Sequence, residues 1–312
     1  MAVYTPVPSE ALETFLQGYD VGTLLSAKGI AEGVQNSNFL VETTSGRYFL
    51  TLYETAVAAD DLPYFLALTA HLADRGLPVP RPIPDRTGTV LQTLQGRPAC
   101  LIQYLSGISL TEPTPAHCHA AGAALGRLHK ASADFAPVRE NDLGPNGWQR
   151  LYTACADHFD DIAPGLGAEV ARDLTTVAAQ WPGQLERATI HADLFPDNVL
   201  MRGTTITGLI DFYFACTDIR AYDLAVLHTA WAFSDDGARH SAERAAALDA
   251  GYRETHGLTD AEAEAMPILC RGACLRFLLT RAYDWINTPA GALVTRKDPL
   301  AYLRRLQHYR AT

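Results

Sequence analysis

The stretch "IHADLFPDNVLM" at residues 190–201, followed shortly by "GLIDFYFA" at residues 208–215, sets polar side chains among apolar ones. The polar residues in question are His191, Asp193, Asn198 and Asp211. Polar groups in apolar surroundings cost stability unless each is hydrogen-bonded or bound to a ligand. Four of them in two short stretches therefore call for a structural or functional explanation.

The length of the chain bears on its architecture. With 312 residues it is at the upper limit for one hydrophobic core, so we expect two packed lobes that share a cleft. Clefts of this kind are where small ligands bind. Apolar residues make up 48% of the chain and charged residues 19%, as in an ordinary globular protein. This composition excludes a disordered, fibrous or membrane-embedded chain.

The formal net charge of −10 bears on possible partners. Binding to nucleic acid or to an anionic membrane surface by broad electrostatic attraction needs clustered Lys and Arg. We therefore expect neither partner, and a phosphate-bearing ligand would have to be held by a local site. The six cysteines are scattered, the opening residues lack a signal-peptide pattern, and no apolar run approaches the roughly 18 residues of a spanning helix. These features are typical of a reduced, cytoplasmic protein.

The N-terminal third of the chain predicts a small antiparallel sheet. A helix capped by Ser9 precedes the sheet, and a second helix, over residues 60–74, interrupts it. Alternation of apolar and polar residues and the turn residues between them predict four strands, at residues 38–43, 47–54, 89–94 and 98–105.

Helices dominate after Gly107, so we place a boundary there, between residues 1–106 and residues 107–312. Helical segments are expected at residues 116–131, 148–163, 167–180 and 261–287. The short apolar segments "VLM" and "ITGLI" near the polar residues predict a small buried hairpin. The expected fold class is α+β, with a small antiparallel sheet lobe and a mostly helical lobe.

The polar residues follow the spacing His-x-Asp-x-x-x-x-Asn, with Asp-Phe at the end of a second apolar segment. Phosphoryl transfer from ATP needs a carboxylate that orients the attacking hydroxyl and accepts its proton, which Asp193 would supply. It also needs oxygen ligands for Mg²⁺, which Asn198 and Asp211 would supply. Asp-Phe or Pro-Asp-Asn alone is more often a turn. The joint spacing and order favour a kinase.

On these residues the sequence resembles the protein kinase-like superfamily, in particular its aminoglycoside phosphotransferase and choline kinase branch. The resemblance extends over nearly the whole chain and includes "HADLFPDN", "IDF" and, further on, "AYDLA". It implies a two-lobed protein kinase-like fold. Residues 1–106 would form the nucleotide-binding lobe, and residues 107–312 the helical lobe with the catalytic loop and the substrate pocket.

The resemblance also implies a role for each matching residue. Asp193 corresponds to the catalytic base, and Asn198 and Asp211 correspond to the metal ligands. His191 and Asp223 correspond to residues that support the catalytic loop structurally.

Within that branch, six separated stretches look like the bacterial homoserine kinases of this fold. They include "GIAEGVQNSNFLVETTSGRYFLTLYE", "HADLFPDNVLM" and "RGACLRFLLTRAYDWINTP". This resemblance implies transfer of a phosphoryl group from ATP to L-homoserine, giving O-phospho-L-homoserine on the way to threonine. The alternative is a kinase of the same fold for an aminoglycoside, choline or a thio-sugar. A nucleotide-binding regulator without turnover is less favoured, because the base and both metal ligands are present.

One departure from the superfamily lies in the third strand, where protein kinases carry a Lys that holds the phosphates. The equivalent position is Thr51, and the hairpin contains no Lys. We expect the Gly- and Asn-rich segment before the hairpin to present backbone N–H groups to the phosphates. The expected nucleotide-binding residues are Gly33, Asn36, Ser37 and Asn38, with Lys28 on the preceding strand and Gln103, Tyr104 and Leu105 in the linker.

The acceptor, a free amino acid, carries a carboxylate, for which Arg is the best-suited partner. The apolar segment at residues 271–285 carries three Arg, and helical geometry puts Arg271 and Arg276 about 140° apart. We expect Arg276 to bind the acceptor carboxylate; a salt bridge to an acid of the same lobe fits the sequence equally well. Two further candidates for lining the acceptor pocket are Tyr213 and Asp218.

Overall fold

The computed structural model describes residues 5–30, 36–54, 58–288 and 296–311. The chain forms two compact units. Unit 1 consists of Met1–Gly107 with Thr207–Tyr213, and unit 2 consists of Ile108–Ile206 with Phe214–Thr312. The two lobes expected from the sequence differ from these units by one residue at the boundary and by the short segment Thr207–Tyr213.

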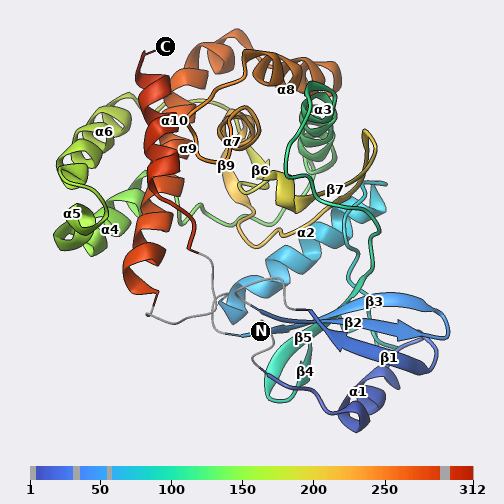
Figure 1. Cartoon of the computed structure of the whole chain (residues 1–312). Helices are drawn as coiled ribbons and strands as arrows, with labels where there is room; N and C mark the ends of the chain where they lie inside the picture. Colours follow the sequence, from blue (N-terminus) through green and yellow to red (C-terminus); the bar gives the residue numbers. More distant parts are fainter. Residues whose placement is uncertain (1–4, 31–35, 55–57, 289–295, 312) are drawn as a thin grey trace. The chain divides into compact units, whose positions relative to one another are not determined.

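Unit 1 contains a five-stranded antiparallel sheet in the order β1-β2-β3-β5-β4 (Figure 1). Its strands are β1 (Leu24–Gly29), β2 (Asn36–Thr43), β3 (Gly46–Tyr53), β4 (Gln92–Leu94) and β5 (Arg97–Gln103). Strands β2 and β3 form one hairpin and β4 and β5 another, as the alternation and the turn residues predicted.

The two helices of unit 1 pack against different faces of this sheet. They are α1 (Ser9–Leu16) and α2 (Leu62–Asp74), the latter preceded by a 3₁₀ turn at Ala59–Asp61. Leu50 and Leu52 of β3 share a core with α1, whereas Tyr53 packs with Leu62 of α2. Successive strand residues point to opposite faces, which explains the division.

The start of α1 differs from the prediction. Pro8, with extended backbone angles, occupies the N-cap position, and no side chain bonds to the helix end. Ser9 is the first helical residue, so the prediction that Ser9 caps the helix was wrong. Proline is tolerated here because a backbone N–H at the start of a helix has no hydrogen-bond partner within the helix.

Unit 2 is mostly helical (Figure 1). Its helices are α3 (Pro115–Ala131), α4 (Pro145–Cys155), α5 (Phe159–Ile162), α6 (Leu166–Gln180), α7 (Arg220–Trp231), α8 (Ala242–Thr255), α9 (Asp260–Asn287) and α10 (Leu300–Ala311), with a 3₁₀ turn at Ala156–His158. Two strand pairs accompany them: β6 (Arg187–Ile190) with β9 (Cys216–Ile219), and β7 (Val199–Arg202) with β8 (Thr205–Leu209). The chain passes from unit 2 into unit 1 within β8.

Helix α7 lies at the centre of unit 2, where Figure 1 shows it end-on between neighbouring helices. It contacts α3, α8 and α9, and nearly all of its residues are buried. Helices α3 and α8 pack closely, because a Cβ at Gly122 or Gly251 would overlap a backbone carbonyl of the facing helix. Helix α3 thus packs against α8 and also contacts α7.

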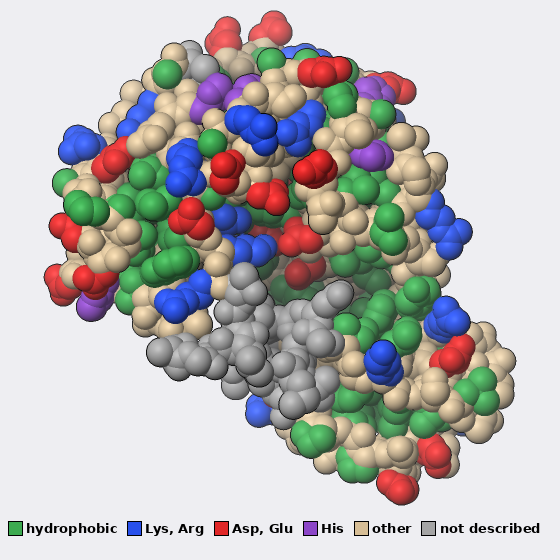
Figure 2. All heavy atoms as spheres, in the orientation of Figure 1, with side chains coloured by type: hydrophobic (Ala, Val, Ile, Leu, Met, Phe, Trp, Pro, Cys, Tyr) green, Lys and Arg blue, Asp and Glu red, His purple; other side chains and the backbone are tan. Residues whose placement is uncertain are grey.

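Among the described helices, none is both long and apolar enough to cross a membrane. On the face drawn in Figure 2, acidic and basic side chains are interspersed. Together with the net charge of −10, this gives no support for a nucleic-acid surface on that face.

Candidate active site

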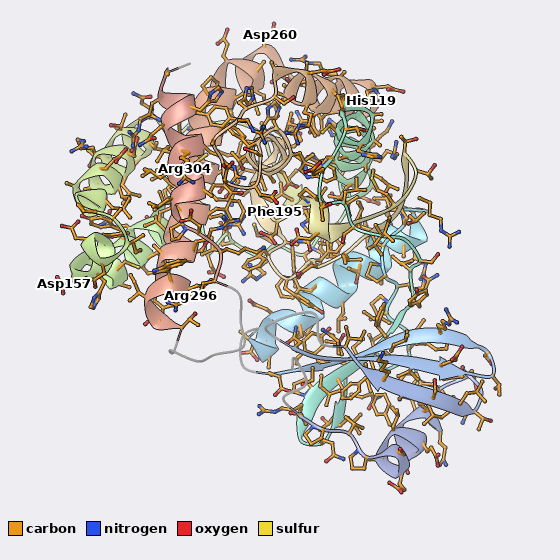
Figure 3. All side chains as sticks on the ribbon, in the orientation of Figure 1. His119, Asp157, Phe195, Asp260, Arg296 and Arg304 are labelled. Atoms are coloured by element: carbon orange, nitrogen blue, oxygen red, sulfur yellow. The ribbon has the colours of Figure 1, made fainter. Side chains whose placement is uncertain are left out.

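The segment between β6 and β7 carries the predicted catalytic residues. Residues 191–198, called here the site loop, leave β6 at Ile190 and end in a 3₁₀ turn at Pro196–Asn198. Figure 3 marks this loop by Phe195, whose ring lies 4.8 Å, centroid to centroid, from that of Phe277 in α9. The loop is thus anchored on the long helix of unit 2.

Backbone geometry singles out two of the residues involved. Three non-glycine residues in the described chain have a positive φ: Gln95 in the β4–β5 turn, Ala192 at 63° and Asp211 at 65°. Such a conformation costs about 1–3 kcal/mol and persists only where surrounding contacts determine it. Ala192 precedes the predicted base, and Asp211 is a predicted metal ligand.

Asp223, at the start of α7, supplies contacts that hold Ala192 in place. Its Oδ2 accepts a hydrogen bond from the N–H of His191 at 2.7 Å, and its Oδ1 accepts one from the N–H of Ala192 at 2.8 Å. Asp223 and His191 are both fully buried. Asp223 thus accepts hydrogen bonds from two consecutive backbone N–H groups of the site loop.

The negative charge of Asp223 has its own buried partner, His129 of α3. His129 Nε2 lies 3.1 Å from Asp223 Oδ2, and its Nδ1 lies 2.8 Å from the hydroxyl of Tyr252 in α8. Burial by itself would raise the pKa of Asp223, but the hydrogen bond and charge of His129 and the N–H of His191 outweigh it and lower that pKa. The carboxylate that supports the loop therefore stays ionised.

Within the site loop, Asn198 orients Asp193. The Asn198 amide nitrogen donates to the backbone oxygen of Asp193 at 2.7 Å and to its carboxylate Oδ2 at 3.2 Å. His191 Nδ1 accepts from the N–H of Asp193 at 3.2 Å, which adds a second side-chain contact within the loop. Since the amide nitrogen of Asn198 faces Asp193, the amide oxygen is the atom of Asn198 suited to a divalent cation.

Arg276 of α9 approaches the same loop from the protein interior. Its Nη1 donates to the backbone oxygen of Ala192, and its Nη2 lies 3.5 Å from Asp193 Oδ1. The Arg276 side chain is 2% exposed, whereas that of Asp193 is 17% exposed. The geometry thus favours the salt bridge, the alternative that the sequence had left open, over a contact with an acceptor carboxylate.

Trp231, at the end of α7, is a contact that the sequence did not reveal. Its indole Nε1 donates to the backbone oxygen of Leu194 at 2.8 Å, and its ring is fully buried. Asp223 and Trp231 therefore hold the site loop from the two ends of one helix. A Trp inside an apolar helix is most often a core residue, so no sequence signal pointed to this role.

The predicted metal ligand Asp211 lies in the part of unit 1 formed by Thr207–Tyr213. It is exposed, while its neighbour Phe212 is buried. The N–H of Leu209 donates to the oxygen of Pro78 at 2.8 Å, which ties this segment to the rest of unit 1. Asp193, Asn198, His191 and Asp223 are brought together in unit 2, and Asp211 belongs to unit 1.

Thr51, which stands where protein kinases have a Lys, is a buried strand residue. Its hydroxyl donates to Oδ1 of Asn38 at 2.8 Å, and the two residues are paired across β2 and β3. Thr51 is 3% exposed. A buried hydroxyl with a partner needs no ligand to satisfy it.

The Asn- and Ser-rich residues expected in a loop lie instead in strand β2, which begins at Asn36. The N–H of Glu54 donates to Asn36 Oδ1 at 3.4 Å, and the hydroxyl of Ser37 donates to Glu54 Oε1 at 2.7 Å. The placement of Asn36 and Ser37 in the loop was therefore wrong, because β2 begins two residues before the predicted strand, which started at Asn38. Gly33 lies outside the described residues.

The other predicted nucleotide-binding residues are on strands or in the linker of unit 1. Lys28 is exposed on β1, opposite Leu40 of β2. Gln103 ends β5, and its N–H donates to the oxygen of Arg81 at 2.8 Å. The ring of Tyr104 lies 5.4 Å from that of Phe49, and Leu105 is half-buried.

The two further acceptor-pocket candidates occupy different surroundings. Tyr213, in unit 1, donates from its hydroxyl to that of Tyr53 at 3.4 Å, and burial raises its pKa. Asp218, on β9, accepts from Asn141 Nδ2 at 2.6 Å and from the N–H of Ile219 at 2.7 Å. Both oxygens of Asp218 thus have protein partners.

Comparison with known proteins places this geometry in context. The sequence profile described as "Phosphotransferase enzyme family" matches residues 26–258. A homoserine kinase of Xanthobacter autotrophicus is 52% identical over 100% of this chain and 97% of its own length. A homoserine kinase of Gluconobacter oxydans is 53% identical over 100% of this chain and 99% of its own length.

Solved structures with low sequence identity share the fold. An amicoumacin kinase in complex with AMP-PNP, Ca²⁺ and Ami has a TM-score of 0.72 at 16% identity, with 97% of this chain and 93% of that chain covered. A choline kinase from Streptococcus pneumoniae has a TM-score of 0.68 at 16% identity, with 97% and 99% covered. These matches confirm the two-lobed, protein kinase-like α+β fold predicted from the sequence.

Proposed function

Because the chain belongs to the phosphotransferase enzyme family, we propose that it transfers the γ-phosphoryl group of ATP to the γ-hydroxyl of L-homoserine. The products are ADP and O-phospho-L-homoserine. The observation that carries the proposal is the 52–53% identity, over the whole chain, to relatives named homoserine kinase. The alternative acceptors, an aminoglycoside or choline, rest on matches that share only the fold, and a thio-sugar rests on the sequence resemblance alone.

In the proposed reaction, Asp193 receives a hydrogen bond from the γ-hydroxyl and takes its proton as the oxygen attacks the γ-phosphorus. The bond from that phosphorus to the bridging oxygen of ADP breaks in the same step. Support comes from the orientation of Asp193, whose Oδ2 accepts from Asn198 at 3.2 Å. A carboxylate is a weak base for an alcohol, so the main contribution of Asp193 is to position the nucleophile.

Asn198 and Asp211 are proposed as the protein ligands of a magnesium ion. Their amide and carboxylate oxygens are the ligand types that Mg²⁺ prefers, and kinase sites complete the shell with phosphate oxygens and water. The bound ion would neutralise charge on the phosphates. The orientation of the Asn198 amide, with nitrogen toward Asp193, fits this assignment.

The nucleotide is proposed to bind to unit 1. The backbone around Gln103, Tyr104 and Leu105 would take the adenine, and Lys28 would compensate phosphate charge in place of the missing strand Lys. Backbone N–H groups near Gly33 would contribute as well. Tyr213 and Asp218 remain proposed as neighbours of the acceptor.

We propose the cytoplasm as the location of the enzyme, since ATP is available there. The six cysteines are all buried and free, which fits a reducing compartment.

The test is consumption of ATP by the purified protein with Mg²⁺ and, separately, L-homoserine, choline, kanamycin or L-serine. We expect turnover with L-homoserine and its loss in Asp193→Asn. Asp197→Asn is the matched control, because Asp197 is an exposed acid of the same loop that pairs with Lys297 at 3.5 Å. Turnover with another acceptor would discard the homoserine assignment, and ATP binding without any turnover would favour a regulator.

A further inference from the structure

We propose that Arg276 is a positioning residue, whose guanidinium fixes the peptide before Asp193 and holds the Asp193 carboxylate in the direction of the acceptor hydroxyl. The inference deepens the proposed function and rests on it, because it takes Asp193 as the catalytic base. It assigns to Arg276 a contact with the base and none with the acceptor.

Arg276 is a buried cation. Arg276 lies in the middle of α9 between Leu275 and Phe277 and is 2% exposed. A buried guanidinium costs several kcal/mol unless it meets an opposite charge or good acceptors. Arg276 meets both on the site loop: the carboxylate of Asp193 and the backbone oxygen of Ala192.

Ala192, the residue before Asp193, has a left-handed backbone conformation with a φ of 63°. Asp223 accepts from the N–H of Ala192 at 2.8 Å, and Arg276 donates to the carbonyl of the same residue. The residue is held from both sides, by a helix start and by the middle of another helix. The carbonyl of Ala192 belongs to the planar peptide that precedes Asp193. Contacts that fix this peptide therefore also fix where the Asp193 side chain leaves the backbone.

The Asp193 carboxylate is held at both of its oxygens. Oδ1 of Asp193 faces Arg276 at 3.5 Å, and Oδ2 receives the amide of Asn198 at 3.2 Å. Each oxygen thus has a defined neighbour, which restricts rotation of the carboxylate about its last bond. An enzyme that works chiefly by positioning gains directly from such restriction.

Two aromatic rings lie near the guanidinium of Arg276. Its carbon lies 4.4 Å from the ring centroid of Phe277 and 5.2 Å from that of Phe214. These rings flank Arg276 and favour a planar cation at this position. Lys has a single ammonium group, whereas the guanidinium of Arg has two terminal nitrogens that point in different directions. A Lys could therefore not make both contacts.

The test compares kcat and KM, for L-homoserine and for ATP, in Arg276→Met, Arg276→Ala, Arg276→Lys and the wild type. Without the contacts of Arg276 to the site loop, Asp193 is misplaced. We therefore expect kcat of Arg276→Met to fall by about 10²-fold, with both KM values changed by less than about threefold. Arg276→Lys should recover only part of the loss. Added guanidinium ion should raise kcat of Arg276→Ala, in which the truncated side chain leaves room for the ion, and leave Arg276→Lys unchanged, an effect that a general loss of packing would not show.

Arg271→Met is the matched control. Arg271 is on the same helix and pairs with Asp173 at 3.2 Å, away from the site loop, and Asp173 keeps Arg310 as a partner. The kcat of Arg271→Met should stay near that of the wild type. If Arg276→Met does not fold, as judged by thermal melting, Arg276→Lys, which keeps the charge, carries the test through its kcat.

Two results would overturn the inference while leaving the proposed function intact. One is an unchanged kcat in both Arg276→Met and Arg276→Lys. The other is a large rise in KM for L-homoserine at unchanged kcat, which would make Arg276 a ligand of the acceptor carboxylate. Full turnover in Asp193→Asn would instead remove Asp193 as the base, and absence of turnover with L-homoserine in the wild type would remove the proposed function, so the failures are distinguishable.

Discussion

The site loop of unit 2 and the β2–β3 hairpin of unit 1 both contain clustered polar side chains, yet they satisfy them in different ways. In the hairpin, polar groups bond to residues directly across the ladder, as Thr51 does to Asn38. In the site loop, His191 and Asn198 bond to Asp193 within the loop itself. The loop backbone is held in addition by helices distant in sequence, through Asp223, Trp231 and Arg276. A local network keeps a strand in register, whereas contacts from distant helices hold a strained loop in one conformation.

The largest expected effect comes from breaking the distant network at Asp223. In Asp223→Asn the buried His129 loses its carboxylate partner and the loop amides lose a charged acceptor. Removing one member of a buried pair costs about 3–5 kcal/mol, so we expect a loss of this size in the free energy of unfolding, measured in urea. Turnover should fall as well, because the site loop is no longer fixed.

The control for this prediction is Asp249→Asn, which breaks a His–Asp pair of similar geometry near the surface. His228 Nε2 lies 2.8 Å from Asp249 Oδ1, and the Asp249 side chain is 39% exposed. A surface pair contributes about 0–1 kcal/mol, so this variant should stay close to the wild type. Equal losses in the two variants would contradict the contrast between buried and surface pairs.

The Asp223 pair also predicts a pH dependence. The pKa of Asp223 is lower in the folded protein than its ordinary value, so its contribution is present above the ordinary carboxyl pKa and is lost as pH falls through the lower folded value. The stability difference between the wild type and Asp223→Asn should therefore be constant from about pH 5 to pH 8 and shrink below about pH 4. Unfolding curves at several pH values would measure it.

The same contrast explains how far the sequence could predict the site. The spacing within one short segment predicted that Asp193 and Asn198 lie together, and the alternation in β2 and β3 predicted the hairpin. The partners of Arg276 and His129 were beyond such patterns, because 84 residues separate Arg276 from Ala192 and 94 separate His129 from Asp223. Helical periodicity shows which side chains share a face, and it cannot show which element that face meets.

The error in unit 1 has a local cause. Asn36, Ser37 and Asn38 have the composition of a loop, because such residues are depleted in strands. In this hairpin their side chains find partners in Thr51 and Glu54, so the strand continues through them. Side-chain hydrogen bonds across a ladder overcame the preference of the individual residues.

A smaller effect is expected from the local network. Thr51→Val keeps the shape of the side chain but leaves Asn38 without its donor, which should lower the free energy of unfolding by about 1–2 kcal/mol. KM for ATP should not change, because Thr51 is buried and bonded within the hairpin. Thr93→Val, at an exposed position of β4, is the control and should have little effect on stability. A raised KM for ATP at unchanged stability would instead give Thr51 a direct role in binding.

The smallest effect concerns Lys28, which lies exposed on β1 of the same sheet and has no stabilising contact to lose among those described. Lys28→Ala should leave stability unchanged and raise KM for ATP by about threefold to tenfold, as expected for one surface charge worth about 1 kcal/mol. The increase should shrink at high salt, since exposed charges are screened. Arg47→Ala, an exposed cation of β3 paired with Glu42 at 3.3 Å, should leave KM for ATP unchanged. If Lys28→Ala also leaves KM unchanged, the charge that replaces the strand Lys must come from elsewhere than this exposed strand. The difference between the two regions would then extend to function: the β2–β3 hairpin and its sheet would contribute backbone and shape, and apart from Asp211 the decisive side-chain charges would belong to the site loop and its supports.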